Sequence, residues 1–292
     1  MNLKDFMNSF WRHLPETINP IAFTVGFFSL YWYAVFFLGG VLGAWLLARF
    51  WARRGMAPCA EEEMFDVLLF LFCGALVGGR IGYVLFYNFD LFLGTPLAII
   101  SPYDFQRSAW TGISGMSYHG GLIGATAALY WWARTKNIPF WNMADFVALL
   151  VPVATFFGRL GNFFNVELSG RVTTEPWGML FPAIAPRGVL RHPSTLYEAF
   201  LEGIVLFVLM MLLRKKMPFS GALACVYIAG YASARFLGEY FRAPDEQLGL
   251  FAVPLAGELT AGQLFSVGML GMAGVIFVWL KHQNHVKLIQ KK

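Results

Sequence analysis

The stretch Gly158-Arg159-Leu160-Gly161-Asn162-Phe163-Phe164-Asn165 closes an apolar run that begins near Met143. It places one arginine and two asparagines inside or at the edge of a segment that is otherwise hydrophobic. Charged and amide groups are costly in a bilayer and usually mark a functional site there. At helical spacing Arg159 and Asn162 lie one turn apart on one face, and Asn165 continues that stripe. The stretch therefore predicts a membrane helix that ends in a polar site.

Apolar runs of similar length recur along the whole chain. Of its 292 residues, 58% are hydrophobic and only 13% are charged, whereas a soluble domain carries about a quarter charged residues. Runs of this length predict helices that span a membrane. We expect an all-α integral membrane protein formed as one integral domain with seven transmembrane helices, at 29–49, 64–87, 116–134, 143–165, 195–213, 221–241 and 260–280.

The lysines and arginines predict the orientation of these spans. Twelve of the 22 flank one set of span ends, and the short loops carry most of them. By the positive-inside rule these ends are cytoplasmic, so the N-terminus lies outside and the C-terminus inside. We expect an amphipathic arm at 1–28, a seven-span domain at 29–281 with a small outer head at 166–194, and a cytoplasmic tail at 282–292.

With this orientation the costly polar groups gather at one depth, near the outer leaflet. A channel or transporter more often places such groups near the midplane or along the whole path. A shared depth instead favours a site for a lipid head group. The groups concerned are Tyr33, Arg80, Tyr83, His119, Arg159, Asn162, Asn165, Tyr231, Arg235 and Glu239.

The arginines predict an anion. Arg80, Arg159 and Arg235 outnumber the acids expected in the outer half, Glu167 and Glu239, and a guanidinium suits phosphate because it can donate two parallel hydrogen bonds. Two structural alternatives stand beside this hypothesis. Arg159 could be an ion-paired residue of helix packing, and Arg235 could simply pair with Glu239, four residues further on.

His119 and the aromatic residues also have two interpretations. His119 could take a proton from a thiol or hold a phosphate, or it could be an interfacial histidine beside a packing seam formed by Gly120 and Gly124. Tyr231 lies one turn before Arg235 and is expected to point into the same space. Tyr33 could be a ligand or an anchor of the aromatic belt.

Other polar residues receive structural predictions only. Asp145 and Glu202 are placed toward the cytoplasmic side without a chemical role. Ser194 is expected to cap a helix N-terminus, with Glu198 in its first turn. The three cysteines form no disulfide framework, no metal-ligand spacing or nucleotide motif occurs, and the net charge of +5 belongs to loops and tail rather than to a nucleic-acid surface.

Five ordered runs resemble the bacterial prolipoprotein diacylglyceryl transferase family. Each run alone is a weak signal, but the ordered set is highly specific and covers the chain from about Tyr31 to the last span. The runs are Gly78-Gly79-Arg80-Ile81-Gly82-Tyr83, Met116-Ser117-Tyr118-His119-Gly120-Gly121, Gly158 to Asn165 as quoted above, Arg191-His192-Pro193-Ser194 with Leu196-Tyr197-Glu198, and Arg235-Phe236-Leu237-Gly238-Glu239-Tyr240-Phe241-Arg242.

The resemblance implies a multi-pass enzyme of the bacterial inner membrane with a periplasmic active site and no cofactor. It would move the sn-1,2-diacylglyceryl group of phosphatidylglycerol to the lipobox cysteine of a prolipoprotein signal peptide, releasing glycerol 1-phosphate. Membrane lipids surround it, and nucleic acid is not a partner. By resemblance the catalytic residues are His119, Arg159, Arg235 and Tyr231, and the substrate-binding residues are Arg159, Asn162, Tyr33, Glu167, Gly170, Glu239 and Arg80.

The chain departs from the family pattern after Asn165. The family usually has Gly-Glu there, whereas Val166 precedes Glu167 in this chain.

Two rival classes predict different features. A transporter or scramblase of anionic lipids would need polar groups in the inner half as well, and the fifth and seventh spans offer almost none. A non-catalytic lipid-binding protein would not need His119.

Overall fold

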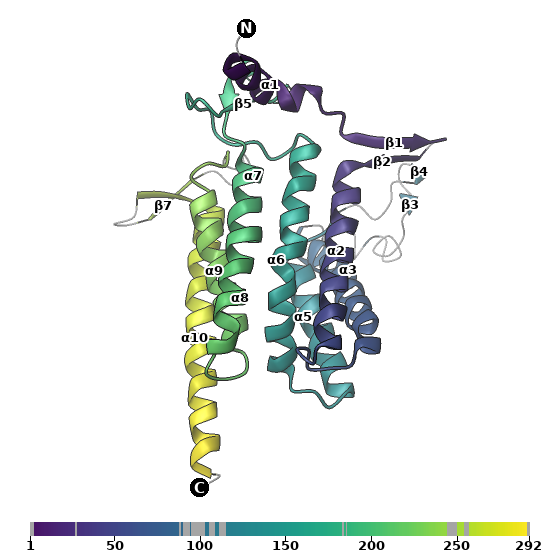
Figure 1. Ribbon diagram of the computed structural model, residues 1–292, viewed down its shortest axis with the longest axis vertical. Coiled ribbons are helices and arrows are strands. Elements are labelled where there is room, and N and C mark those ends of the chain that lie inside the picture. Colours follow the sequence, from purple (N-terminus) through teal and green to yellow (C-terminus); the bar gives the residue numbers. More distant parts are fainter. Residues whose placement is uncertain are drawn as a thin grey trace. The chain divides into compact units, whose positions relative to one another are not determined.

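The computed structural model describes residues 3–26, 28–87, 89, 94, 103–104, 109–110, 115–182, 184, 186–243, 250–253 and 257–290. Helices dominate these residues, accompanied by short two-stranded antiparallel hairpins (Figure 1). The chain forms two compact units, one made of 1–47 and 145–292, the other of 48–144. Most of the connection predicted at 88–115 lies outside the described residues.

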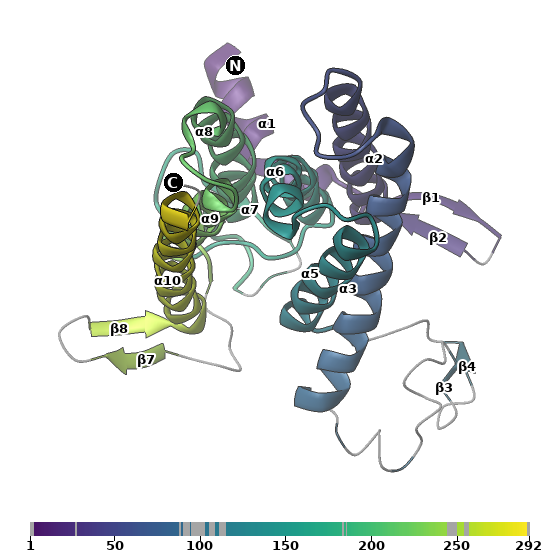
Figure 2. The ribbon, with the colours of Figure 1, turned by 90° about the horizontal axis from the view of Figure 1, so that it is seen from below.

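The unit at 48–144 is built on two helices packed closely together. The 3-10 turn η1 (Glu61–Glu63) leads into α3 (Met64–Tyr87), the hairpin β3–β4 follows (Tyr103–Asp104 and Ala109–Trp110), and α5 spans Tyr118–Thr135. Figure 2 shows α3 and α5 side by side. A Cβ added at Gly78 would lie 2.3 Å from the Gly120 carbonyl oxygen, and one at Gly124 only 2.1 Å from that of Gly74. The predicted glycine seam is therefore confirmed as a helix–helix contact.

The other unit begins with α1 (Leu3–Thr17), the hairpin of β1 (Ile21–Val25) and β2 (Phe28–Tyr31), and α2 (Trp32–Arg53). Helix α1 packs against β5. Trp11 and Leu14 contact a core of Phe163, Val166, Met179 and Phe181, and the Trp11 indole N–H donates to the carbonyl of Trp177 at 2.8 Å. These contacts fix the N-terminal helix onto the segment that follows α6.

Helix α6 (Phe140–Phe164) leads into the segment at 166–194, where β5 (Met179–Leu180) and β6 (Leu190–Arg191) pair. The next helix runs continuously through four stretches: α7 (Ser194–Glu198), the π-helical η3 (Ala199–Val205), α8 (Leu206–Leu213) and η4 (Arg214–Lys216). A π-helical segment inside an α-helix is rare and frequently lies at a functional site.

Helix α9 (Ala222–Gly238) lies against α8 and α10, and the hairpin β7–β8 (Leu250–Val253 and Gly257–Thr260) leads into α10 (Ala261–Gln290). Asp145 holds the start of α9, because its two carboxylate oxygens accept from the N–H groups of Gly221 and Ala224, both at 2.7 Å. This carboxylate replaces the cap that α9 lacks in its own sequence. It also fixes the position of α9 along α6.

A helix covers each of the seven ranges predicted from the sequence, with shifted ends. Helix α10 continues to Gln290, ten residues beyond the expected limit, and α9 is shorter than expected. Five helices of the described part are long and apolar enough to cross a membrane, while α9 is apolar but shorter. Large apolar side chains such as Phe86, Ile123 and Val275 are 78%, 68% and 71% exposed, as expected of surfaces that face lipid. The chain is therefore a multi-pass helical membrane protein.

Candidate active site

The carboxylate of Glu198 binds the two arginines that the sequence singled out. Arg159 comes from α6 and Arg235 from the last turn of α9. Nη1 of Arg159 lies 2.9 Å from Oε2 of Glu198, and Nη1 of Arg235 lies 3.0 Å from Oε1. The Glu198 side chain is fully buried, and the arginine side chains are only 16% and 19% exposed. Two guanidinium groups from separate helices are thus separated by a single carboxylate.

Three further charged residues complete the cluster. Nε of Arg159 lies 2.9 Å from Oε2 of Glu202, Nη2 of Arg235 pairs with Oε1 of Glu239, and Nη1 of Arg242 lies 3.5 Å from Oε1 of Glu198. Among the described residues the cluster therefore holds three arginines and three carboxylates.

This balance corrects one prediction. The expected surplus of cations was wrong, because the carboxylates of Glu198 and Glu202 neutralise it. Glu202, to which no chemical role was assigned, has a side chain that is 0% exposed and pairs with Arg159. The structural alternatives for the arginines hold in part: Arg159 is ion-paired between helices, and Arg235 does pair with Glu239.

The position of the two acids on their helix explains why Arg159 must be there. Glu198 and Glu202 lie four residues apart, at the entry into the π-helical segment. Like charges at this spacing repel each other, and buried carboxylates without partners are strongly destabilising. Arg159 binds both of them. Removing one partner of a buried pair typically costs about 3–5 kcal/mol, so this guanidinium supports the fold.

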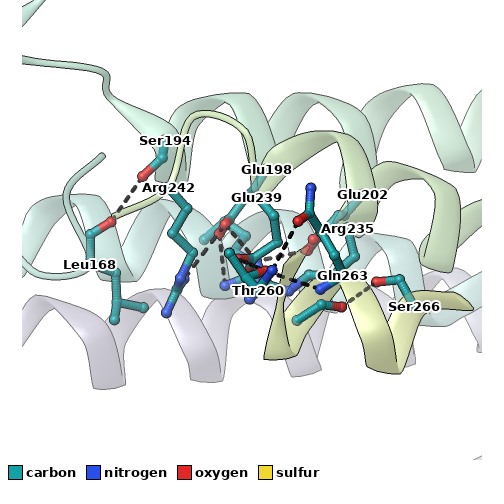
Figure 3. A network of polar contacts seen from close by, with 12 residues as sticks. Leu168, Ser194, Glu198, Glu202, Arg235, Glu239, Arg242, Thr260, Gln263 and Ser266 are labelled. Atoms are coloured by element: carbon teal, nitrogen blue, oxygen red, sulfur yellow. Dashed lines mark hydrogen bonds and ion pairs between the residues drawn. The ribbon is translucent and has the colours of Figure 1, made fainter. Parts of the chain in front are cut away.

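The acid Glu239 is held from its other side by the start of α10. Figure 3 shows Glu239 between Arg235 and Thr260. The Thr260 hydroxyl donates to Oε2 of Glu239 at 2.8 Å, and both residues are 4% exposed. The predicted site residue Glu239 is therefore fully engaged by protein groups on both carboxylate oxygens.

A second polar group lies where α6 ends. The Asn162 amide donates to Oε1 of Glu167 at 2.8 Å, and the side-chain oxygen of Asn165 accepts from the Tyr33 backbone N–H at 3.1 Å. The bond to Tyr33 ties the first turn of α2 to the stretch 158–165 at the end of α6. The Tyr33 side chain is 38% exposed, and its hydroxyl interacts electrostatically with Glu167 and Arg159. Tyr33, Asn162 and Glu167 are thus brought together, as the sequence predicts.

Gly170 occupies a place where no side chain fits. A Cβ there would lie 2.4 Å from the carbonyl oxygen of Phe241 and 2.5 Å from that of His192. The Gly170 N–H donates to the His192 carbonyl at 3.0 Å, and its own carbonyl accepts from Nη1 of Arg191 at 3.2 Å. Gly170 also forms an isolated antiparallel bridge with Arg242. It thereby joins the segment after α6 to the arginine end of α9.

Tyr231 lies on α9 one turn before Arg235, with its ring stacked on Tyr227 at 6.2 Å. It interacts electrostatically with Arg159. The expectation that its hydroxyl shares the space of the arginines agrees with this interaction.

His119 and Arg80 belong to the other compact unit. His119 is an exposed residue in the first turn of α5, and its ring meets that of Tyr118 edge to face at 5.8 Å. Arg80 donates from Nη1 to the Gly115 carbonyl at 3.2 Å and lies 5.7 Å from the centre of the Tyr83 ring. Their convergence with Arg159 and Arg235 stays a prediction.

The prediction that Ser194 caps its helix was wrong. Pro193 is the residue that precedes the helix, and the Ser194 hydroxyl instead donates to the Leu168 carbonyl at 2.9 Å. This bond ties the start of α7 to the loop after α6 (Figure 3).

Four residues in or against the cluster were not predicted from the sequence: Glu198, Glu202, Arg242 and Thr260. The signal for the first two was present, because two carboxylates four residues apart in an apolar span are costly and face one side of a helix. Thr260 and Gln263 have the spacing of a capping box. Arg242 carries no signal beyond its place at the end of the run that begins at Arg235.

The fold and cluster define a class: a multi-pass helical membrane protein with buried arginine–carboxylate pairs joining separate helices. The family model for prolipoprotein diacylglyceryl transferase matches residues 20–279. A protein of Chlorobaculum tepidum named phosphatidylglycerol–prolipoprotein diacylglyceryl transferase is 42% identical over 277 residues, covering 94% of each chain. A protein of the same name from Vibrio vulnificus is 44% identical over 275 residues, covering 94% of this chain and 96% of the relative. This chain belongs to the prolipoprotein diacylglyceryl transferase family.

Proposed function

We propose that this protein transfers the diacylglyceryl group of phosphatidylglycerol to the thiol of a lipobox cysteine in a prolipoprotein signal peptide. The names of relatives that cover nearly the whole chain support the two substrates. The observation that carries the proposal at the level of the site is the convergence of Arg159 and Arg235 on Glu198. When two guanidinium groups contact the same carboxylate, they lie near enough to each other to hold the oxygens of one phosphate.

The charge balance of the cluster decides how a phosphate would be held. In Arg159, Nε donates to Oε2 of Glu202 and Nη1 lies against Oε2 of Glu198. The phosphate would bind the part of the guanidinium that the carboxylates leave open, while Glu198 and Glu202 keep the group in place. A guanidinium fork fixed in this way loses little conformational freedom when it binds its ligand.

The reaction is a substitution at the carbon of the diacylated glycerol that carries the phosphate ester. The cysteine sulfur forms a bond with this carbon as the carbon–oxygen bond to phosphate breaks. The thiol proton passes to His119 or, if His119 only orients the phosphate, to the departing phosphate, and the electron pair of the broken carbon–oxygen bond leaves on glycerol 1-phosphate. Arg159 and Arg235 would stabilise the negative charge that grows on the leaving oxygen, and such electrostatic stabilisation usually lowers the barrier most in a site that excludes water. Neither substrate requires a cofactor for this step.

The other residues take supporting roles in this proposal. His119 would act on the thiol, either as a base, because a free thiol has a pKa of about 8.5, or by orienting the phosphate. Tyr231, Asn162 and Glu239 would orient the arginines and the head group. Substrate contacts are assigned to Tyr33, Glu167, Gly170 and Arg80.

We further propose a seven-span topology in the bacterial inner membrane, with the N-terminus in the periplasm and the C-terminus in the cytoplasm. The distribution of lysine and arginine supports this orientation. The arm at 1–28 and the head at 166–194 would then lie on the periplasmic side, 29–281 would form the transferase domain, and 282–292 the cytoplasmic tail.

The direct test is an assay with purified protein in detergent, phosphatidylglycerol and a lipobox peptide. We expect the peptide mass to rise by one diacylglyceryl group, and His119→Ala to abolish the signal. Arg54→Lys, at an exposed arginine beside Phe50, is the matched control and should act like wild type. An unmodified peptide with the wild-type protein, under conditions in which phosphatidylglycerol binds, would refute the transferase.

A further inference from the structure

The start of α10 contains a complete capping box. In the segment Thr260-Ala261-Gly262-Gln263, the Gln263 backbone N–H donates to the Thr260 hydroxyl oxygen at 3.1 Å, and the Thr260 N–H donates to the side-chain oxygen of Gln263 at 3.0 Å. These reciprocal bonds satisfy two N–H groups at the helix start. Thr260 and Gln263 are each 4% exposed, so both members of the box are buried.

The cap uses only the oxygen of the Thr260 hydroxyl, and its hydrogen goes elsewhere. This hydrogen is donated to Oε2 of Glu239 at 2.8 Å. The other oxygen of Glu239 pairs with Nη2 of Arg235. A continuous chain of polar contacts therefore runs from the first turn of α10 to the guanidinium of Arg235 (Figure 3).

The backbone at Gly262 confines Glu239 from the same side. A Cβ at this position would lie 2.5 Å from Oε1 of Glu239 and 2.7 Å from its carboxyl carbon. Only a glycine leaves the carboxylate room to sit where it binds both Thr260 and Arg235. The first turn of α10 thus fixes Glu239 by one donated hydrogen bond and by steric confinement.

We propose that the Thr260–Gln263 capping box is a positioning device for Arg235, acting through Glu239. It rests on the proposed function, in which Arg235 holds the phosphate of phosphatidylglycerol. Thr260, Gly262 and Gln263 touch no substrate in this proposal. They hold the Glu239 carboxylate in the one place from which it can orient the guanidinium, and a displacement of about 1 Å in a reacting group can cost up to about a hundredfold in rate.

If Thr260 and Gln263 only capped the helix, the variants would behave differently than if they also positioned Arg235. Thr260→Val keeps the shape but removes both the cap oxygen and the donated hydrogen, so it lowers the melting temperature and the activity. Thr260→Ser keeps both bonds. Gly262→Ala leaves the cap intact and favours the helical backbone, yet it displaces Glu239. If only the cap mattered, Gly262→Ala would be harmless.

The experiment measures kcat for transfer to a lipobox peptide, the affinity for phosphatidylglycerol in mixed micelles, and the melting temperature of each variant. We expect Thr260→Val and Gly262→Ala to lower kcat about tenfold or more and to weaken phosphatidylglycerol binding. Thr260→Ser should retain at least about half of kcat, since it keeps both bonds. The control is Gly268→Ala on the same helix, where an added Cβ meets nothing within 4 Å, and it should match wild type.

Wild-type kcat and lipid affinity for Gly262→Ala would overturn the positioning role. So would losses that only follow a fall in melting temperature. If the wild-type protein transfers nothing, the proposed function fails, and the binding measurement still decides whether the capping box positions Arg235 for an anionic lipid.

Discussion

At the scale of single residues, Arg159 has two duties that one substitution can separate. Its guanidinium binds Glu198 and Glu202 from inside the fold, and in our account it also holds the phosphate. Arg159→Lys keeps the positive charge but loses the planar fork, because an ammonium cannot make parallel bonds in fixed geometry.

We therefore expect Arg159→Lys to fold, because the retained positive charge still pairs with the buried Glu198 and Glu202 carboxylates, and to lose about a hundredfold in transfer rate, equal to about 3 kcal/mol. The measurement is transfer to a lipobox peptide, with folding followed by size-exclusion chromatography and thermal unfolding. Near-normal transfer by this variant would count against bidentate binding of phosphate.

Val166 has a backbone conformation that suits glycine. Its φ is 55°, in the left-handed region, and its side chain is 8% exposed in the core under α1. A β-branched residue there stores about 1–3 kcal/mol of strain, and the apolar contacts of the valine offset it by about 1.5 kcal/mol.

We expect Val166→Gly to change the free energy of unfolding by less than about 1.5 kcal/mol, since the two effects nearly cancel. Val84→Gly, at a buried helical position with 2% exposure, is the control and should cost about 3 kcal/mol, because burial and helix propensity are both lost. Thermal unfolding in detergent compares the two, and equal losses would show that Val166 carries no strain.

At the scale of elements, the contact between α3 and α5 depends on the absence of side chains. The backbone at Gly124 lies so close to Gly74 that an added methyl group would overlap a carbonyl oxygen. Overpacking of this kind typically costs about 1–3 kcal/mol. The two helices carry Arg80 and His119, so their separation would move both residues.

Gly124→Ala should therefore lower the melting temperature and reduce transfer, whereas Gly271→Ala on α10, where nothing lies within 4 Å, should do neither. Thermal unfolding and the peptide assay on both variants test this. If Gly124→Ala matches Gly271→Ala in both measurements, the α3–α5 seam is not a tight packing contact.

The segment between α6 and α7 contains a histidine, His192, whose ring contacts a tyrosine hydroxyl. The Trp177 indole donates to the Tyr197 hydroxyl at 2.8 Å, and that hydroxyl lies 3.3 Å from Nδ1 of His192. The Tyr197 hydroxyl can then donate its hydrogen to Nδ1 of His192 only if that nitrogen is unprotonated. Burial lowers the pKa of His192 from its ordinary value of 6.5.

Because the folded state binds this proton less tightly than the unfolded state, the contribution of His192 is fully present above pH 6.5 and is lost as the pH falls through its lowered pKa. His192→Gln keeps an acceptor that does not titrate, so its melting temperature should fall less than that of wild type between about pH 7.5 and about pH 5. His285→Gln, an exposed histidine of α10, is the control. An unchanged pH dependence in His192→Gln would contradict the assignment.

At the scale of the whole molecule, hydrophobic run length predicts the helices well because each span must satisfy its own backbone in lipid. It predicts the partners of the polar groups poorly. From the sequence, Glu202 was assigned by its depth along a span and Glu198 by its position in the first turn of a helix. Neither criterion predicts that both side chains bind Arg159. Depth describes one helix, whereas the cluster depends on how α6, α7 and α9 are packed together, and no local pattern encodes this.

The same limit applies to Thr260 and Glu239. A capping box can be recognised from its spacing, but the donation of its hydroxyl hydrogen to Glu239, next to the end of α9, follows only from the packing of α9 against α10. Arg159 and Arg235 can be found from the sequence because a charge in an apolar span is informative by itself.

In the proposed enzyme, Arg159 and Arg235 together hold the phosphate of one phosphatidylglycerol molecule. The most direct measurement is an experimental structure of the protein with this lipid bound. We expect phosphate oxygens about 2.8 Å from guanidinium nitrogens of both arginines, with Glu198 still in contact with at least one of them. A head group bound elsewhere, with both arginines held by carboxylates alone, would contradict it.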